Sequence, residues 1–314
     1  MRTYLPEGRN LNTLKNRQHL SSPAAVAEAA AKGEILEAMV LLCDLKHNLI
    51  VDLGCMRGII PREEGAIGIA EGKVRDIALI SRVGKAVSFI VSAIKTDEEG
   101  KLYAILSRRA AQEKCREEYI STLETGRVID ARITHLENFG AFCDIGCGVI
   151  SLLPIDAISV SRISHPADRF SPGDDIRAVV KGIDAQGRVS LSHKELLGTW
   201  EENAARFALG ETVTGIVRSV EEYGIFVELA PNLAGLAEPR AGVRPGQMAS
   251  AYIKNLLPEK MKVKLIIIDA FDAEYAKKPI EYFFQGEFLD KWRYSPEKCD
   301  KSVETVFVPS GVVC

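Results

Sequence analysis

A basic stretch between residues 240 and 264 is the densest group of side chains in the sequence that could carry chemistry. One acidic residue, Glu259, stands against six basic ones, which are Arg240, Arg244, Lys254, Lys260, Lys262 and Lys264. Two aromatic residues, Tyr223 and Phe226, come shortly before this stretch. Cations bind phosphate groups and aromatic rings accept stacked bases, so the arrangement favours contact with a nucleic acid. The alternative is an ordinary solvated charged face.

Signals for catalysis or metal binding are weak. The sequence has no phosphate-binding glycine loop, no His-Glu-x-x-His helix and no nucleophile elbow, and its five histidines are scattered. Cys143 and Cys147 flank a turn and are the alternative metal ligands, but no third ligand has suitable spacing. The seven cysteines include no Cys-x-x-Cys pair and read as reduced thiols. We expect no enzyme activity, no cofactor, no metal and no small-molecule substrate.

Composition limits the class of protein. A chain of 314 residues with 46% hydrophobic content can bury more than one core, whereas its net charge of −3 leaves no overall basic footprint. Any nucleic-acid binding must therefore be confined to a local basic patch. No apolar run is long enough for a bilayer span and the start lacks a signal-peptide pattern, so we expect a soluble cytoplasmic protein without a membrane partner.

An internal repeat positions these residues. The stretch Asn138–Gly146 has weaker copies at residues 48–54 and 223–230, and aligning them on an acidic residue sets Asp52, Asp144 and Glu228 in register. Around each copy lie short apolar runs with the two-residue period of half-buried strands, separated by Gly and Asp turns. This pattern predicts an all-β fold of three tandem OB-type five-stranded barrels joined by short helices.

The expected organisation assigns nearly the whole chain. It comprises an N-terminal extension (1–32) with a Ser-capped helix from Pro23, module one (33–108), a helical linker (109–123), module two (124–195), a second helical linker (196–207), module three (208–285) and a C-terminal tail (286–314). In the second linker, Trp200 has the spacing of a residue that packs on a barrel. In module three we expect a strand at 261–268 and a last strand at 279–284 after a longer loop.

Module two resembles the S-one (S1) RNA-binding domain, the OB-fold module of ribosomal protein S-one. The matching segments, in order, are Gly126-x-Val128, Asn138-Phe139-Gly140-Ala141-Phe142, Pro172-Gly173-Asp174, Ile183-Asp184 and Gly187-Arg188-Val189-Ser190-Leu191-Ser192. Modules one and three match in outline. The resemblance identifies the chain as a member of the ribosomal protein S-one family.

The resemblance implies an RNA face made of two aromatics, a histidine, an acid and an arginine. In module two these positions fall on Phe139, Phe142, Pro154, Asp184 and Arg188, so the histidine is absent. A spacing of three sends two strand residues to opposite faces, so either Phe139 precedes the strand, Gly140 permits a bulge, or one ring is buried. Asp184 and Arg188 also fit a surface ion pair that only closes a turn.

The other two modules keep less of this pattern. Module three retains the aromatics as Tyr223 and Phe226, has Glu238 at the histidine position and shows no matching arginine. Module one has Lys46 and Leu49 at the aromatic positions and Pro61 at the histidine position, and it retains the last pair as Asp97 and Lys101. We expect modules two and three to contact RNA, and module one with the N-terminal extension to dock on protein. An electrostatic contribution of module one to RNA binding stays open, through Arg57, Arg62, Lys73, Arg75, Arg82 and Lys85.

The implied function is binding of single-stranded messenger RNA near the small ribosomal subunit, in translation. Two alternatives stay open: a protein-interaction scaffold that has lost RNA binding, and a non-catalytic RNA-binding partner of a ribonuclease. The absent histidines favour the scaffold, whereas three repeats that fill the chain argue against an enzyme.

Overall fold

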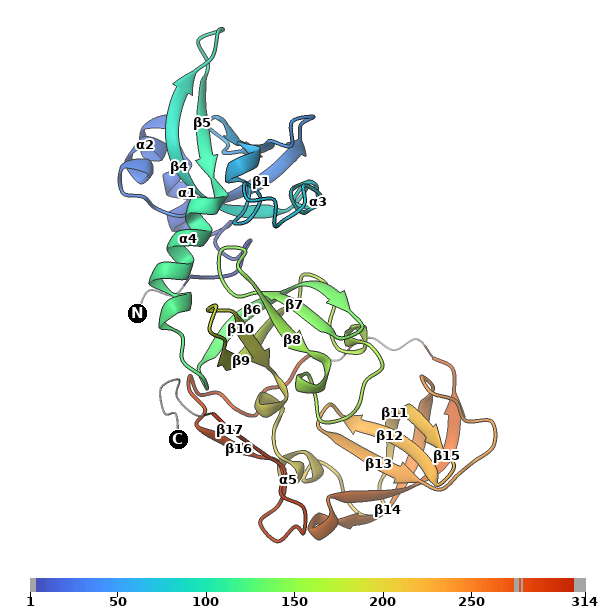
Figure 1. Ribbon diagram of the computed structural model, residues 1–314. Coiled ribbons are helices and arrows are strands. Elements are labelled where there is room, and N and C mark those ends of the chain that lie inside the picture. Colours follow the sequence, from blue (N-terminus) through green and yellow to red (C-terminus); the bar gives the residue numbers. More distant parts are fainter. Residues whose placement is uncertain (1–3, 274–276, 278, 308–314) are drawn as a thin grey trace. The chain divides into compact units, whose positions relative to one another are not determined.

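The computed structural model describes residues 4–273, 277 and 279–307 (Figure 1). Three closed five-stranded barrels account for most of this part of the chain, which confirms the predicted all-β, OB-type fold class. Contacts divide the chain into two compact units. The first holds barrel one and its surrounding helices, with Asp130–Arg132 and Asp144–Ile150 of barrel two, and the second holds the rest of barrel two and barrel three. Within the described residues no helix has the length and apolar character needed to span a bilayer.

The N-terminal extension folds onto barrel one. Helix α1 covers Leu14–His19, and helix α2 covers Pro23–Ala31. The side chain of Ser22 accepts a hydrogen bond from the backbone N–H of Ala25 at 3.2 Å and Pro23 begins the helix, which confirms the predicted capped helix. Val26 and Ala29 are fully buried against the core of barrel one.

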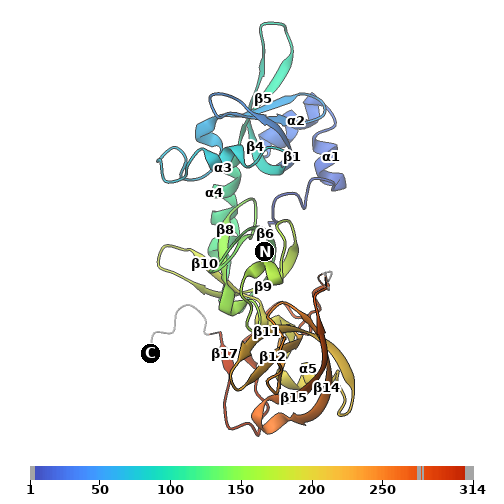
Figure 2. The same cartoon turned by 90° about the vertical axis from the view of Figure 1, so that its right-hand side faces the viewer.

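Barrel one pairs its strands in the order β1-β2-β3-β5-β4. Its strands are β1 Leu36–Cys43, β2 Leu49–Asp52, β3 Arg57–Ile60, β4 Ala86–Thr96 and β5 Leu102–Ser107, and helix α3 Ile77–Ile80 lies between β3 and β4. The hairpin of β4 and β5 extends as a long arm, visible in both views (Figure 2). Helix α4, Arg108–Glu118, follows β5, where the sequence predicted a helix.

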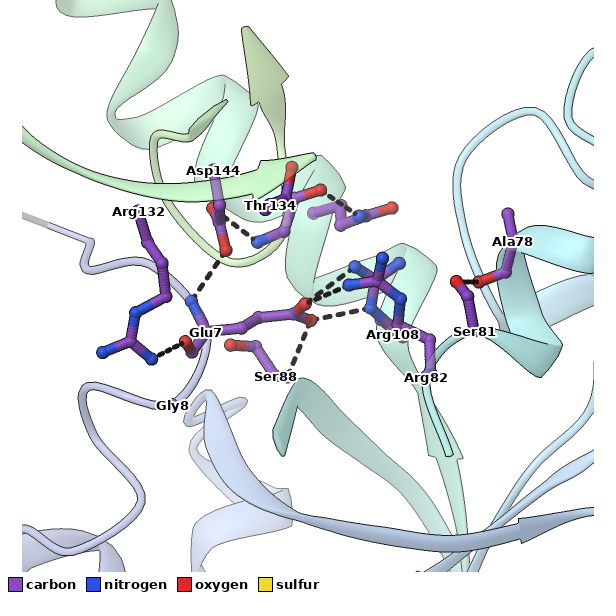
Figure 3. Close-up of polar contacts among 12 residues, drawn as sticks. Glu7, Gly8, Ala78, Ser81, Arg82, Ser88, Arg108, Arg132, Thr134 and Asp144 are labelled. Carbon is purple, nitrogen blue, oxygen red and sulfur yellow. Dashed lines mark hydrogen bonds and ion pairs between the residues drawn. The ribbon is translucent and has the colours of Figure 1, made fainter. Parts of the chain in front are cut away.

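A segment before α1 is anchored by charge. The Glu7 carboxylate accepts two hydrogen bonds from the guanidinium of Arg108, at 2.7 and 2.9 Å, and one from the backbone N–H of Ser88 at 3.0 Å (Figure 3). The backbone N–H of Glu7 donates to the Asp144 carboxylate at 2.8 Å. All four residues are buried, so these contacts are shielded from solvent.

Barrel two has the strand order β10-β8-β7-β6-β9. Its strands are β6 Val128–Glu137, β7 Gly140–Asp144, β8 Ile150–Pro154, β9 Asp175–Ile183 and β10 Val189–Ser192. The long connection between β8 and β9 contains only short 3-10 turns, and Phe170 from this connection is buried.

Barrel three corrects one sequence expectation. Its strands are β11 Thr212–Glu221, β12 Gly224–Ala230, β13 Leu233–Ala237, β14 Met248–Leu257 and β15 Lys262–Phe271, in the order β11-β12-β13-β15-β14. The strand expected at 261–268 is therefore the fifth, and the strand expected at 279–284 is wrong. The fourth strand was missed because its inward side chains include Ala249 and Ala251, whose small size makes the apolar alternation weak.

The second linker and the tail complete the core around barrel three. Helix α5, Trp200–Ala204, begins with a capping box of Thr199 and Glu202. Trp200 is 2% exposed and belongs to the barrel-three core, as its helical spacing predicted. The tail forms a small hairpin of β16 Lys291–Arg293 and β17 Glu304–Val306, whose Trp292 joins the same core.

Candidate nucleic-acid interface

The two aromatic pairs have the same geometry in barrels two and three. The ring centroids of Phe139 and Phe142 are 6.0 Å apart at an interplanar angle of 90°. Those of Tyr223 and Phe226 are 6.1 Å apart at 86°. Phe139 is 56% exposed and Tyr223 is 68% exposed. Two sequence-distant barrels thus present one arrangement of rings to solvent.

The turn before the second strand brings both rings outward. Phe139 lies in the turn that precedes β7, and Phe142 alternates with the buried Ala141 and Cys143 on that strand. Neither ring is therefore a core residue, and the alternative that one is buried is wrong. A Cβ at Gly140 would lie 2.5 Å from the carbonyl oxygen of Leu153, so a glycine is needed where this turn meets β8.

A histidine that the family pattern did not locate lies beside Phe142. The ring of His135, on β6, is 6.4 Å from the ring of Phe142 with an interplanar angle of 22°, close to a parallel stack. Its Nε2 atom is 2.8 Å from the Glu137 carboxylate, and its side chain is 64% exposed. The sequence offered little signal, because the family histidine follows the third strand, where Pro154 stands. Barrel two thus carries three rings on one face.

Asp184 and Arg188 form the surface ion pair that the sequence left as an alternative. The Arg188 Nε donates to an Asp184 oxygen at 2.6 Å, and the other Asp184 oxygen accepts the backbone N–H groups of Gln186 and Arg188, each at 2.9 Å. These hydrogen bonds from Arg188 lower the pKa of Asp184. The Arg188 side chain remains 73% exposed. The pair shapes the turn and leaves the guanidinium open to a ligand.

Strand register places a cation of barrel three where barrel two has Arg188. The third and fifth strands run parallel in both barrels, with Leu152 opposite Ser190 in barrel two and Leu236 opposite Lys264 in barrel three. Each leucine lies two residues before its module's histidine position. Arg188 precedes Ser190 by two residues, and Lys262 precedes Lys264 by two. Arg188 and Lys262 therefore occupy equivalent positions in their barrels. Module three has no arginine at this position, as its sequence indicated, but Lys262 supplies a cation there.

Lys264 shares the outward face with the aromatic pair. Phe226 on β12 lies opposite Leu236 on β13, which lies opposite Lys264 on β15. The flanking residues Ile225 and Val263 are buried, so this row faces outward.

Some side chains of the basic stretch are already paired within the protein, and others are not. Arg240 donates to the carbonyl oxygens of Ile267 and Ile268, both at 2.6 Å, and therefore supports β15. Arg244 pairs with Asp272 at 2.8 Å, and Lys254 pairs with Glu238 at 3.4 Å. Within this stretch, the exposed lysines for which the described residues offer no acidic partner are Lys260, Lys262 and Lys264.

Register also corrects the aromatic positions of module one. Leu49 is fully buried, whereas its neighbour Ile50 lies opposite Ile59 on β3, as Phe226 lies opposite Leu236. Ile50 is therefore the counterpart of Phe226, and the residue three positions before it is His47, not Lys46. Asp97 accepts the backbone N–H of Lys101 at 2.8 Å, which is the same turn bond that Asp184 makes.

The barrels and their matching faces define a tandem OB-fold protein. Residues 122–194 match the family model of the S1 RNA binding domain. The small ribosomal subunit protein bS1 of Leuconostoc lactis is 32% identical over 86% of this chain and 59% of its own length. The bS1 protein of Staphylococcus aureus (strain COL) is 30% identical over 84% of this chain and 67% of its own length. The bS1 homolog of Bacillus subtilis (strain 168) is 31% identical over 73% of this chain and 58% of its own length.

The chain belongs to the family of small ribosomal subunit protein bS1, which confirms the resemblance seen in its sequence. It spans between 58% and 67% of the length of these three relatives.

Proposed function

We propose that this protein binds single-stranded RNA through the outer faces of barrels two and three, and holds messenger RNA at the small ribosomal subunit in the cytoplasm. The observation that carries the proposal is the repeated arrangement itself. Each barrel has an outward aromatic pair, one ring exposed and the other half-buried, with centroids about 6 Å apart, and a cation at one register position. The bS1 relatives supply the ribosomal setting. No catalytic step is part of this role.

The chemistry of the face suits a single strand. Unpaired bases expose their flat surfaces, and stacking on an aromatic side chain contributes about 1–3 kcal/mol per base. Arg188, Lys262 and Lys264 supply positive charge to the phosphates that connect the stacked bases. A duplex hides its base faces, so it cannot use the rings. Discrimination between single and double strands is therefore the expected signature.

Stacking and charge are separable by experiment. The 314-residue protein is titrated into a fluorescent single-stranded RNA of about thirty nucleotides, which is long enough for two or more OB sites. Anisotropy is recorded across a salt series, with duplex RNA as the comparison. Phe142→Ala and Phe226→Ala should each raise Kd by about five-fold or more with an unchanged salt slope. Lys262→Ala should flatten the slope by about 0.7.

Lys254→Ala is the matched control, because Lys254 lies in the same basic stretch but is paired with Glu238. It should change neither Kd nor slope appreciably. Absence of single-strand binding by the wild-type protein at low salt would overturn the proposal. So would a wild-type affinity equal for duplex and single strand.

A further inference from the structure

Barrel one carries a row of three outward side chains on neighbouring strands, in which an aromatic ring lies between two positive charges. Arg57 on β3 lies opposite Tyr103 on β5, and Tyr103 lies opposite Lys95 on β4. Arg57 and Lys95 are exposed and Tyr103 is half-buried, whereas the adjacent Gly58 and Ala104 are buried. Side chains opposite one another on adjacent strands are neighbours, so the ring is flanked by two cations.

The position of Tyr103 matches that of the cations in the other barrels. Ile59 lies opposite Ile105 in barrel one, as Leu236 lies opposite Lys264 in barrel three. Tyr103 precedes Ile105 by two residues, and Lys262 precedes Lys264 by two. Barrel one therefore has a ring where barrels two and three have Arg188 and Lys262. The sequence hides this match because the β4–β5 hairpin is longer and moves the Asp97 turn away from the barrel.

The two flanking cations are not used by the fold. Neither Arg57 nor Lys95 pairs with an acidic side chain in the part of the chain that the structure describes. Two other cations of barrel one are paired: Arg62 pairs with Asp76 at 2.8 Å, and Lys101 with Glu99 at 2.7 Å.

An acidic residue also lies near this row. Asp52 is opposite Arg57 on β2, and one of its oxygens accepts the backbone N–H of Gly54 at 2.8 Å. Its charge weakens the positive field beside Arg57.

We propose that barrel one is a third RNA contact, in which Tyr103 stacks on a base while Arg57 and Lys95 bind the phosphates on either side. This inference rests on the proposed RNA binding by barrels two and three. The site is a sheet face with an aromatic side chain between two unpaired cations, and a polyanion with flat bases complements it in both charge and shape. It takes up the electrostatic contribution that the sequence left open for module one, instead of protein docking.

Anisotropy with the 314-residue protein tests the inference on two RNA lengths. A thirty-nucleotide strand can reach several barrels, whereas a strand of about eight nucleotides occupies roughly one OB site. Tyr103→Ala should weaken binding of the long strand about three- to ten-fold, because one of several linked contacts is lost. Its effect on the short strand should be under two-fold, because barrels two and three still bind it. Tyr103→Phe, which keeps the ring, should bind the long strand like the wild type.

The two cations allow an independent test that does not depend on the ring. The double variant Arg57→Ala, Lys95→Ala should flatten the salt slope for the long strand by about 1.4. Lys101→Ala is the matched control, since it removes a lysine of the same hairpin that is already paired with Glu99. Photo-crosslinking of a 4-thiouridine strand should also label the peptide that contains Tyr103, and Tyr103→Ala should remove that label.

The outcomes separate this inference from the proposed function. In one outcome the wild type binds RNA and Phe142→Ala weakens binding, but Tyr103→Ala and the double variant of Arg57 and Lys95 bind like the wild type. Barrel one is then not an RNA contact, and only this inference is refuted. Equal losses for Tyr103→Phe and Tyr103→Ala would also overturn it, because Phe keeps the ring and binding would then not depend on stacking. If the wild type binds no RNA, the proposed function itself fails.

Discussion

Replacing Asp144 with Asn should change how stability depends on pH. Asp144 is 2% exposed, and one of its oxygens accepts the backbone N–H groups of Gly146 and Gly148 at 2.8 and 3.0 Å. The other accepts the backbone N–H of Glu7, whose carboxylate is held by Arg108 (Figure 3). Burial, followed by repulsion from the Glu7 carboxylate, raises the pKa of Asp144 from 3.8 to about 7.

The direction and the size of the pH dependence of stability follow from this pKa shift. A pKa that is higher in the folded state means that the fold binds the proton more tightly than the unfolded chain. The contribution of Asp144 is fully present below about pH 4 and is lost as pH rises through about 7. At about 1.4 kcal/mol per pH unit, the loss across this window is on the order of 4 kcal/mol. Asn resembles the protonated acid, so the Asn variant should not lose this stability as pH rises.

Amide hydrogen exchange at Gly146 and Gly148 is the direct assay, because these amides donate to Asp144 and report its local opening. Opening free energies, corrected for intrinsic exchange rates, are compared between wild type and Asp144→Asn from pH 4.5 to 8. His193 has the opposite slope, since burial lowers its pKa to about 4, and its contribution is lost as pH falls. The difference between the two proteins cancels that effect.

The expected result is a difference that grows in favour of the variant as pH rises to about 7. Asp184→Asn is the control, because hydrogen bonds lower the pKa of that exposed acid and its contribution is lost only at acid pH. A wild-type and variant pair with parallel pH curves would refute the reasoning, since it would mean that Asp144 keeps its ordinary pKa.

Two further substitutions test contacts of the second unit. Glu228→Gln should destabilise the protein by about 3–5 kcal/mol in urea unfolding, because the carboxylate is 6% exposed and pairs with Arg169 at 2.5 Å and Arg218 at 2.7 Å. A loss under about 1 kcal/mol would mean that the arginines find other partners. Gly140→Ala should cost about 1–3 kcal/mol, because its Cβ would lie 2.5 Å from the Leu153 carbonyl oxygen. It should also weaken RNA binding, and unchanged stability would show that the turn can relax.

The sequence predicted the fold class because each module has strong local signals. In module two the inward Ile129, Ala131 and Ile133 alternate with polar residues, and this period is visible without any structure. In module three the fourth strand alternates polar side chains with Ala249 and Ala251, which carry little apolar contrast. The last strand was therefore placed too late in the chain.

The candidate site was predictable only where the spacing along the chain is preserved. Phe139 and Phe142 are separated from each other by two residues, and so are Tyr223 and Phe226, so both pairs were found. Lys262 was not recognised as the counterpart of Arg188, because the two hairpins have different turns and only strand pairing relates them. His135 comes from another strand altogether, and its stacking on Phe142 is a tertiary contact that no linear pattern encodes.

The acidic residue that aligns the repeats has a structural explanation. Asp144 and Glu228 are both buried, the first bonded to backbone N–H groups and the second to two arginines. Asp52, their counterpart in barrel one, is exposed and bonds the nearby turn. Two of the three acids thus anchor segments outside their own sheet, a role that restricts the residue type more than an RNA contact would. The clearest mark of the repeat therefore reports how Asp144 and Glu228 anchor neighbouring segments, while the proposed RNA face carries Arg188, Lys262 or Tyr103 at the matching position.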